Sequence, residues 1–306
     1  MHLGNVFSAL LSWLSAKSQG GEWVLRIEDI DPQRSRQEYA DQLMADLEWL
    51  GLYWDGTPIY QSQRSEIYRE YLEVLQQKGM VYADHRTRAD LLATQAPHES
   101  DGRVVVHRPE ASLKAMPAKE QVPTSRQAPV KDQAQFREQE SPQAALRLEV
   151  PHETVTFIDG HYGEATVDLW DHVGDFIVRR KDGAYAYQLA VVVDDALSGV
   201  TEIVRGRDLL LSTAQQNWVH GLIFPNEAPI ATYHFPLLIN EAGQRLSKRD
   251  KSLDMGVLRS QYSAPEIIAM LARYAGIAVP EGEHVTPEAL MQHFEWGRVP
   301  KEDIVV

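Results

Sequence analysis

The sequence predicts an α/β fold with a parallel sheet, and three features of the chain point to it. A short, mostly apolar run over 23–27 has the length of a buried strand and is followed by two helical stretches with short connections. A second apolar run, 187–193, ends in two aspartates and fits a buried parallel strand. After residue 251 the pattern is helical. We therefore expect a parallel sheet, helices packed on it, and a C-terminal helical segment.

Apolar spacing and turn residues place the individual elements. In chain order we expect a helix over 5–18, a strand over 23–27, a helix that begins near Ser35, a helix over about 62–78, strands over 146–150 and 154–158, and a helix from about Ser263 to Tyr274. The first helix is followed by Gly20 and Gly21, which favour termination. Ser35 and Glu38 have the spacing of a capping box.

The stretch over 94–142 differs in composition from the rest of the chain. It holds six prolines, many glutamines and a single aromatic residue, Phe136. Such a composition is typical of a loose insertion or linker rather than of a packed domain.

Composition and charge exclude several classes of protein. The chain has 306 residues, a net charge of −14 and no cysteine. A nucleic acid would therefore have to bind a local basic patch, and disulfides, a thiolate nucleophile and zinc sites built on sulfur are excluded. No apolar stretch approaches the roughly 20 residues of a membrane span, and no signal peptide is recognisable. We expect a soluble, cytoplasmic protein.

His2-Leu3-Gly4-Asn5 stands directly before the first predicted helix. A helix N-terminus offers unpaired backbone N–H groups and partial positive charge, so it suits a phosphate, and glycine allows close approach. Taken alone, four such residues are more often an ordinary helix cap.

A second candidate element is Arg245-Leu246-Ser247-Lys248-Arg249, which follows a predicted tight turn over 240–243. Three cations within five residues of a loop are suited to holding a triphosphate, where positive charge stabilises the leaving group. Taken alone, such a run is more often a solvated basic surface.

Together, the two elements resemble the paired ATP signatures of the class I aminoacyl-tRNA synthetases. The resemblance to the glutamyl branch of that family continues, in the same order and spacing, through the segments 25–32, 60–64, 175–180, 186–195 and 204–206. It implies a Rossmann-like catalytic domain with an inserted acceptor-binding-like subdomain. On this basis we divide the chain into a first half of the nucleotide-binding domain (1–80), the inserted subdomain (81–166), the second half with the Lys248 loop (167–250), and a C-terminal helical segment (251–306).

Chain length distinguishes members of that branch. Only 306 − 248 = 58 residues follow Lys248, whereas a full glutamyl-tRNA synthetase adds a larger helical anticodon-binding region. The chain therefore resembles the short paralogs, which in the family activate glutamate without tRNA and transfer it to queuosine in the anticodon of tRNA(Asp). The implied partners are L-glutamate, ATP with Mg²⁺, and tRNA(Asp), and we expect a monomer. Two alternatives remain: a catalytic module that charges a tRNA 3′ end, and a catalytically impaired paralog that binds nucleotide or RNA.

The resemblance also implies a role for each matching position. The expected ATP-binding residues are His2, Gly4, Asn5, Arg245, Ser247 and Lys248, of which His2 and Lys248 are the expected catalytic residues. Glu28 would hold the α-ammonium of glutamate, Arg205 its side-chain carboxylate, and Tyr187 would shape the pocket. Without the motif context, Glu28 reads as a strand-end carboxylate, Arg205 as half of an ion pair, and Tyr187 as a core residue.

The chain departs from the family pattern in two places. A first strand that normally precedes the His2 motif is not in the sequence, and we expect a start site upstream of Met1, with an impaired protein as the alternative. Asp84 and Arg86 occupy positions where short members commonly carry cysteine ligands of zinc. A cation repels a metal, so we expect no zinc; a site built from Asp84 and the histidines His85, His98 and His107 is the less favoured reading.

Overall fold

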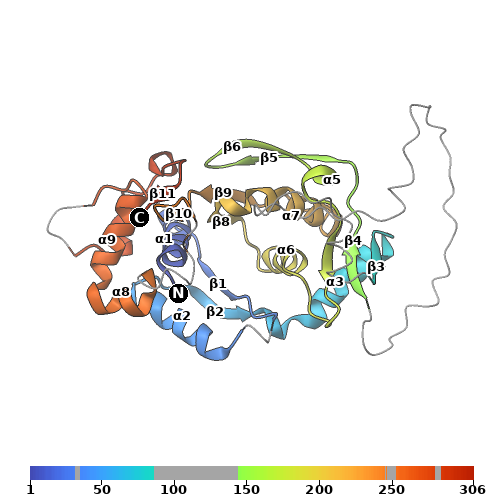
Figure 1. Ribbon diagram of the computed structural model, residues 1–306, viewed down its shortest axis with the longest axis horizontal. Helices are drawn as coiled ribbons and strands as arrows, with labels where there is room; N and C mark the ends of the chain where they lie inside the picture. Colours follow the sequence, from blue (N-terminus) through green and yellow to red (C-terminus); the bar gives the residue numbers. More distant parts are fainter. Residues whose placement is uncertain (32–34, 86–143, 245, 247–252, 280–283) are drawn as a thin grey trace.

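The computed structural model describes residues 1–31, 35–85, 144–244, 246, 253–279 and 284–306 (Figure 1). Helices α8 (Met255–Gln261) and α9 (Ala264–Tyr274) lie at one end of the elongated molecule, and the antiparallel sheet of β3 (Val81–Asp84), β4 (Ala145–Leu148) and β7 (Phe176–Arg179) lies at the other. The predicted α/β class is confirmed.

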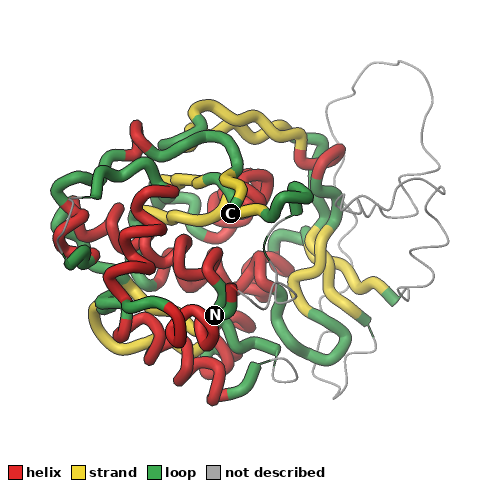
Figure 2. The backbone as a smooth tube through the Cα atoms, turned by 60° about the vertical axis from the view of Figure 1, so that its left-hand side comes forward, coloured by secondary structure: helices red, strands yellow, loops and turns green. Residues whose placement is uncertain are grey.

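The parallel strands lie in the middle of the molecule. Strand β1 (Val24–Ile27) pairs in parallel with β2 (Asp55–Tyr60), and β8 (Glu202–Gly206) pairs in parallel with β9 (Ala231–Phe235). Strand β9 also meets β5 (Thr154–Asp159), which forms an antiparallel hairpin with β6 (Gly163–Asp168). Figure 2 shows that hairpin and the β3–β4–β7 sheet as separate groups of strands.

Helix α1 (Leu3–Ser18) forms the centre of the largest hydrophobic core, because its side chains at near-helical spacing are apolar. Leu10, Leu11 and Leu14 are completely buried, and the helix packs on β8. Around it lie α2 (Gln37–Trp49), α9, α10 (Pro287–Met291), the short pair β10 (Leu238–Ile239) and β11 (Ile304–Val305), and the 3₁₀ turn η5 (Trp296–Arg298). This core fixes the start of α1, where the first candidate motif stands.

A second core joins the helices α3 (Ser65–Gln77), α6 (Tyr187–Leu197) and α7 (Leu210–Ile223). The turns η1 (Gln61–Gln63) and η3 (Arg207–Leu209) lead into α3 and α7, and α5 (Leu169–His172) follows β6. None of the described helices is both long and apolar enough to cross a membrane.

The prediction for the second apolar run is wrong. The run 187–193, expected to be a parallel strand, is the first part of helix α6. An apolar run fits a buried helix as well as a buried strand, and residues 189–193 are buried in the second core. The helix begins at Tyr187. Asp194 lies on the same face two turns later, and Asp195 is about 12 Å from Tyr187 along the helix axis.

The remaining elements lie close to their predicted positions. The capping box predicted for Ser35 and Glu38 is absent, because α2 begins two residues after Ser35 and its N-cap is Arg36, which makes no side-chain capping bond. The helix expected over 62–78 is divided between η1 and α3. In α9, where the sequence predicted only the helix, a capping box is present, since the Glu266 carboxylate accepts from the Ser263 backbone N–H at 2.7 Å. The division of the chain into four segments stays a prediction.

Candidate active site

The start of helix α1 forms one wall of a pocket. His2, Gly4, Asn5, Phe7 and Ser8 line it from this side. The other lining residues come from the ends of β8 and β9, from β10 and from the second motif: Gly206, Phe235, Leu237, Leu238 and Leu246. The His2 backbone N–H donates to the Asn5 side-chain oxygen at 3.1 Å, which closes the first turn. The predicted ATP-binding residues at the N-terminus therefore lie together on one pocket wall.

Two glycines keep that pocket open. A Cβ on Gly4 would lie 3.2 Å from two atoms of the His2 ring, so a larger residue at position 4 would make the ring shift from its place over the helix start. A Cβ on Gly206 would lie 2.5 Å from the Asp208 Oδ1 atom and 3.0 Å from a Leu237 methyl carbon. This is a suitable cradle for a nucleotide, because backbone N–H groups remain accessible at a helix N-terminus.

The second motif reaches the same pocket through Leu246. This residue is buried, and its backbone N–H donates to the Leu238 carbonyl oxygen at 3.2 Å. Arg245, Ser247 and Lys248 lie outside the described residues. The contact of Leu246 nevertheless brings a segment more than 200 residues downstream beside the start of α1.

Arg205, on β8, has an unusual environment. Its side chain is 9% exposed, and its guanidinium donates to the His234 Nε2 atom at 3.1 Å, to Gln216 Oε1 at 2.7 Å and to Thr213 Oγ1 at 2.8 Å. Within the described part of the chain, no carboxylate forms an ion pair with it. Burial accordingly lowers the pKa of Arg205, and the surrounding charges do not offset that effect. A buried cation held only by neutral acceptors is a suitable receptor for a carboxylate.

Tyr187 lies near enough to Glu28 and Arg205 for their charges to act on its hydroxyl. Although 37% of the tyrosine side chain is exposed, burial of its hydroxyl and the charge of Glu28 raise its pKa. The Glu28 side chain is 45% exposed at the end of β1, and burial of its carboxyl group raises its pKa. The three predicted glutamate-binding residues thus meet in one region, with opposite charges at its two sides.

Arg26 and Asp195 support Glu28. Arg26, two residues before Glu28 on β1, lies 3.4 Å from the Glu28 carboxylate and also pairs with Asp195 of α6. These carboxylates outweigh burial and raise the pKa of Arg26. The pairing fixes β1 against α6 at the level of the site.

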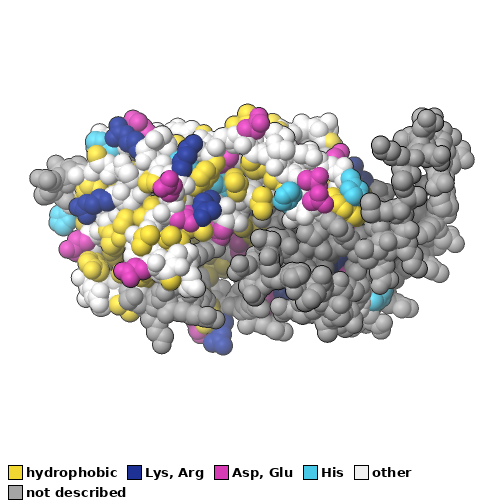
Figure 3. Space-filling model, turned by 45° about the horizontal axis from the view of Figure 1, so that its top comes forward, with side chains coloured by type: hydrophobic (Ala, Val, Ile, Leu, Met, Phe, Trp, Pro, Cys, Tyr) yellow, Lys and Arg dark blue, Asp and Glu magenta, His cyan; other side chains and the backbone are white. Residues whose placement is uncertain are grey.

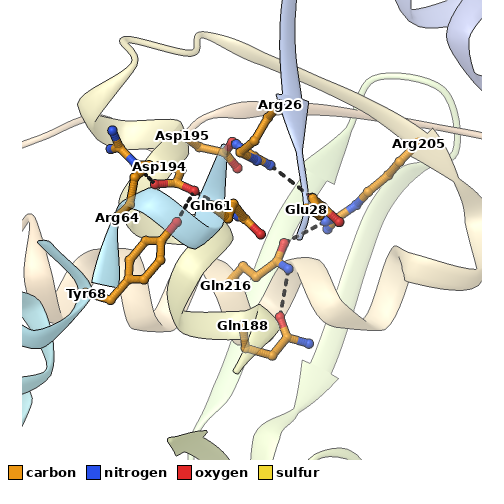
Figure 4. Close-up of polar contacts among 10 residues, drawn as sticks. All are labelled: Arg26, Glu28, Gln61, Arg64, Tyr68, Gln188, Asp194, Asp195, Arg205 and Gln216. Atoms are coloured by element: carbon orange, nitrogen blue, oxygen red, sulfur yellow. Dashed lines mark hydrogen bonds and ion pairs between the residues drawn. The ribbon is translucent and has the colours of Figure 1, made fainter. Parts of the chain in front are cut away.

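Asp194 connects three segments beneath the site (Figure 4). Its side chain is completely buried and accepts from Gln61 Nε2 at 2.8 Å, Arg64 Nε at 2.6 Å and the Tyr68 hydroxyl at 2.7 Å. Figure 4 also shows Gln188 beside Gln216. The Gln188 Oε1 atom accepts from Gln216 Nε2 at 2.7 Å, and this bond holds Gln216 in place beside Arg205. Helix α6 therefore carries residues that hold the neighbours of both Glu28 and Arg205 in place.

The structure adds supporting residues to those predicted from the sequence. Arg26, Gln188 and Asp195 fall within the motif segments, but their contacts are not evident from the sequence. Thr213, Gln216, His234 and Asp159 fall outside those segments. His234 is a buried histidine on β9, and its local sequence carries no signal of a role at the site.

The segment that aligns with zinc ligands in the family has a different local partner. The Asp84 carboxylate accepts from Arg147 Nε at 2.6 Å, and both side chains are buried. Arg86, His98 and His107 lie outside the described residues. The expected absence of zinc stays a prediction.

The sequence is similar to a family of known proteins. A family model described as "tRNA synthetases class I (E and Q), catalytic domain" matches residues 1–304. A Symbiobacterium thermophilum protein named glutamyl-Q tRNA(Asp) synthetase is 38% identical, over 99% of this chain and 91% of its own length. A protein of the same name from Nitratidesulfovibrio vulgaris is 39% identical, over 90% of this chain and 83% of its own length.

Solved structures resemble the whole chain. The glutamate-tRNA synthetase of Elizabethkingia anophelis superposes with a TM-score of 0.77 at 24% identity, covering 100% of this chain. A glutamate tRNA ligase of Elizabethkingia meningosepticum, solved in complex with its amino acid, gives 0.76 at the same identity. The chain spans 65% and 64% of their respective lengths. The likeness establishes a Rossmann-like class I catalytic fold.

Proposed function

The chain belongs to the class I aminoacyl-tRNA synthetases, within the family of the glutamyl-Q tRNA(Asp) synthetases, and on this premise we propose that it activates L-glutamate with ATP in the absence of tRNA and transfers the glutamyl group to queuosine in the anticodon of tRNA(Asp). The enzyme is a ligase. The family implies ATP and Mg²⁺, and we treat Mg²⁺ as part of the nucleotide substrate.

The observation that carries the proposal is the buried Arg205 guanidinium with neutral acceptors around it. Placing a cation in such a site is costly unless a ligand supplies the matching anion. The side-chain carboxylate of glutamate supplies one, and a guanidinium can bind it in a bidentate geometry. Glutamine, with a neutral carboxamide, does not compensate the charge, so the site favours glutamate.

The reaction proposed here needs no protein nucleophile. Glu28 holds the α-ammonium group, Tyr187 and Arg205 hold the side chain, and the glutamate α-carboxylate is left to attack the α-phosphorus of ATP. A carboxyl–phosphate bond forms, the bond between the α-phosphorus and the bridging oxygen breaks, and pyrophosphate leaves. His2, Gly4 and Asn5 hold the nucleotide, while Arg245, Ser247 and Lys248 stabilise charge on the leaving pyrophosphate. The tRNA acceptor group then displaces AMP from the glutamyl-adenylate.

The choice of acceptor rests on the names of the relatives and not on any residue of the site. Figure 3 shows one face on which the coloured basic side chains lie scattered among acidic ones. With a net charge of −14, the protein has to hold tRNA through local contacts. The second candidate function, charging of a tRNA 3′ end, is favoured by the fold shared with the glutamate-tRNA synthetases.

Pyrophosphate exchange into ATP tests the activation step. The purified protein, supplied with ATP, Mg²⁺ and labelled pyrophosphate, is expected to exchange label when glutamate is present and tRNA is absent. Exchange with another amino acid and not with glutamate would overturn the substrate assignment. Binding of ATP without exchange for any of the twenty amino acids would favour the catalytically impaired nucleotide-binding paralog.

A further inference from the structure

We propose that Asp159 and His234 form a positioning pair that orients Arg205 for the side-chain carboxylate of the substrate. The inference rests on the proposed function, since it assumes that Arg205 meets that carboxylate. Asp159 ends β5, His234 lies on β9 and Arg205 lies on β8, so the three residues form a chain across neighbouring strands. Asp159 is 1% exposed and His234 is completely buried.

The hydrogen bonds fix the tautomer of His234. Arg205 Nε always carries a proton, and it lies 3.1 Å from His234 Nε2, so Nε2 has to be the acceptor. The imidazole proton is then on Nδ1, which donates to Asp159 Oδ2 at 2.6 Å. The Thr213 hydroxyl accepts from Arg205 Nη2 at 2.8 Å and lies 3.3 Å from Nε2, whose single lone pair already accepts from Arg205. The bonds from Arg205 to His234 and from His234 to Asp159 are both satisfied with one assignment of protons.

Asp159 is built to remain ionised in this position. Its Oδ1 atom accepts from the backbone N–H groups of Tyr162 at 2.8 Å, His161 at 3.1 Å and His234 at 3.3 Å. Burial alone would raise the pKa of Asp159, but these bonds and the bond from the His234 ring lower it. A stable anion thus stands behind the imidazole and keeps the proton on Nδ1.

The arrangement explains how Arg205 is held in position while no carboxylate of the described residues pairs with its Nη1 and Nη2 atoms, which would bind the ligand. Asp159 acts on Arg205 through the imidazole, and the Nη1 and Nη2 atoms, which donate to Gln216 and Thr213, keep one N–H each for a ligand. If the proton moved to His234 Nε2, that N–H would face the Nε–H of Arg205. Two donors would then oppose each other at 3.1 Å, and the guanidinium would have to turn.

A purely structural role for the pair predicts a different outcome. Asp159 also fastens the turn after β5 to β9, so a structural role would lower stability without acting selectively on glutamate. Asp159→Asn separates the two roles. Its carbonyl oxygen is able to keep the backbone bonds, while its amide group donates to His234 Nδ1 and forces the proton onto Nε2. The substitution exchanges donor and acceptor in the contact with His234 Nδ1 and preserves the shape of the side chain at position 159.

The experiment compares this variant with two substitutions of His234 by pyrophosphate exchange. Asp159→Asn and His234→Leu are expected to raise the KM for glutamate about 10- to 100-fold, the range for a lost hydrogen bond to a charged group, with KM for ATP and kcat within about threefold. His234→Gln can accept from Arg205 and donate to Asp159, and it is expected to recover most of the loss. His220→Gln, the same change at a buried histidine of α7 away from the site, is the control and is expected to leave glutamate KM unchanged.

The ¹⁵N spectrum of His234 gives a readout that does not depend on activity. The proton is expected on Nδ1 in the wild-type protein and on Nε2 in Asp159→Asn. A folded Asp159→Asn variant with unaltered glutamate KM, or a wild-type proton on Nε2, would overturn the inference. If the wild-type protein showed no exchange with glutamate, the proposed function would fail, and the tautomer would still decide whether the pair orients Arg205.

Discussion

Replacement of Arg205 is the most informative change at the glutamate site. Arg205→Ala removes the guanidinium, and Arg205→Lys keeps the positive charge but loses the planar fork. In the structure the guanidinium is fixed by bonds of 2.7, 2.8 and 3.1 Å to Gln216, Thr213 and His234. An ammonium group has three donors at the end of a flexible chain and cannot make these contacts and a bidentate contact with substrate together.

The size of the effect follows from burial of the pair. Arg205 is 9% exposed, so the contact with a substrate carboxylate is that of a desolvated charged pair. Truncating one partner of such a pair costs about 2–5 kcal/mol, which corresponds to about 30- to 5,000-fold in kcat/KM. Because the side chain of glutamate is remote from the reacting atoms, the contact is equally strong before and during reaction. The loss is therefore expected in KM, with kcat little changed.

Steady-state exchange kinetics with varied glutamate measure this effect. Arg205→Lys is expected to recover less than about tenfold of the loss in Arg205→Ala. Arg207→Lys is the matched control, because Arg207 lies two residues away on the same segment, is 44% exposed and pairs with Asp303. If Arg205→Ala left the glutamate dependence unchanged, or if Arg207→Lys raised glutamate KM equally, the assignment of the side-chain pocket would be wrong.

Four further predictions concern the rest of the site. Asp194→Ala is expected to lower the free energy of unfolding by about 3–5 kcal/mol in denaturant titrations, because it leaves a buried ion pair broken, and a loss below about 1 kcal/mol would contradict this. Tyr187→Phe is expected to raise glutamate KM severalfold with unchanged ATP KM, and equal effects on both would assign the residue to general packing. Burial raises the pKa of Glu28 above its ordinary value of 4.5, so glutamate KM is expected to rise with falling pH already above pH 4.5. Glu28→Gln is expected to remove that dependence. A flat wild-type profile of glutamate KM down to pH 4.5 would refute the role of Glu28. Lys248→Ala is expected to lower mainly kcat, since its charge meets the leaving pyrophosphate, and a change confined to glutamate KM would count against that role.

The sequence is informative where function depends on short segments. Glu28 at a strand end and the His2-to-Asn5 motif before a helix are recognisable from local pattern, whereas Arg205 is identified only through the resemblance to the family. The structure brings the Glu28, Tyr187 and Arg205 side chains into one region and places Leu246 in the pocket beside His2. Their roles with substrate stay predictions.

Two features could not be predicted from the sequence, for physical reasons. The run 187–193 is apolar except for Gln188, and from 189 to 193 it shows neither a period of two nor one of 3.6, so the choice of helix depends on tertiary packing. The chain from Asp159 through His234 to Arg205 joins three strands that are far apart in sequence. Such contacts depend on strand pairing, which no local pattern specifies.

The most direct test of the central claim is to measure transfer of labelled glutamate to purified tRNAs. The account predicts that the protein, with ATP and Mg²⁺, labels tRNA(Asp) that contains queuosine, and labels neither tRNA(Asp) that lacks queuosine nor tRNA(Glu). Charging of unmodified tRNA(Glu) at its 3′ adenosine would contradict it and would favour the catalytic module of a glutamyl-tRNA synthetase.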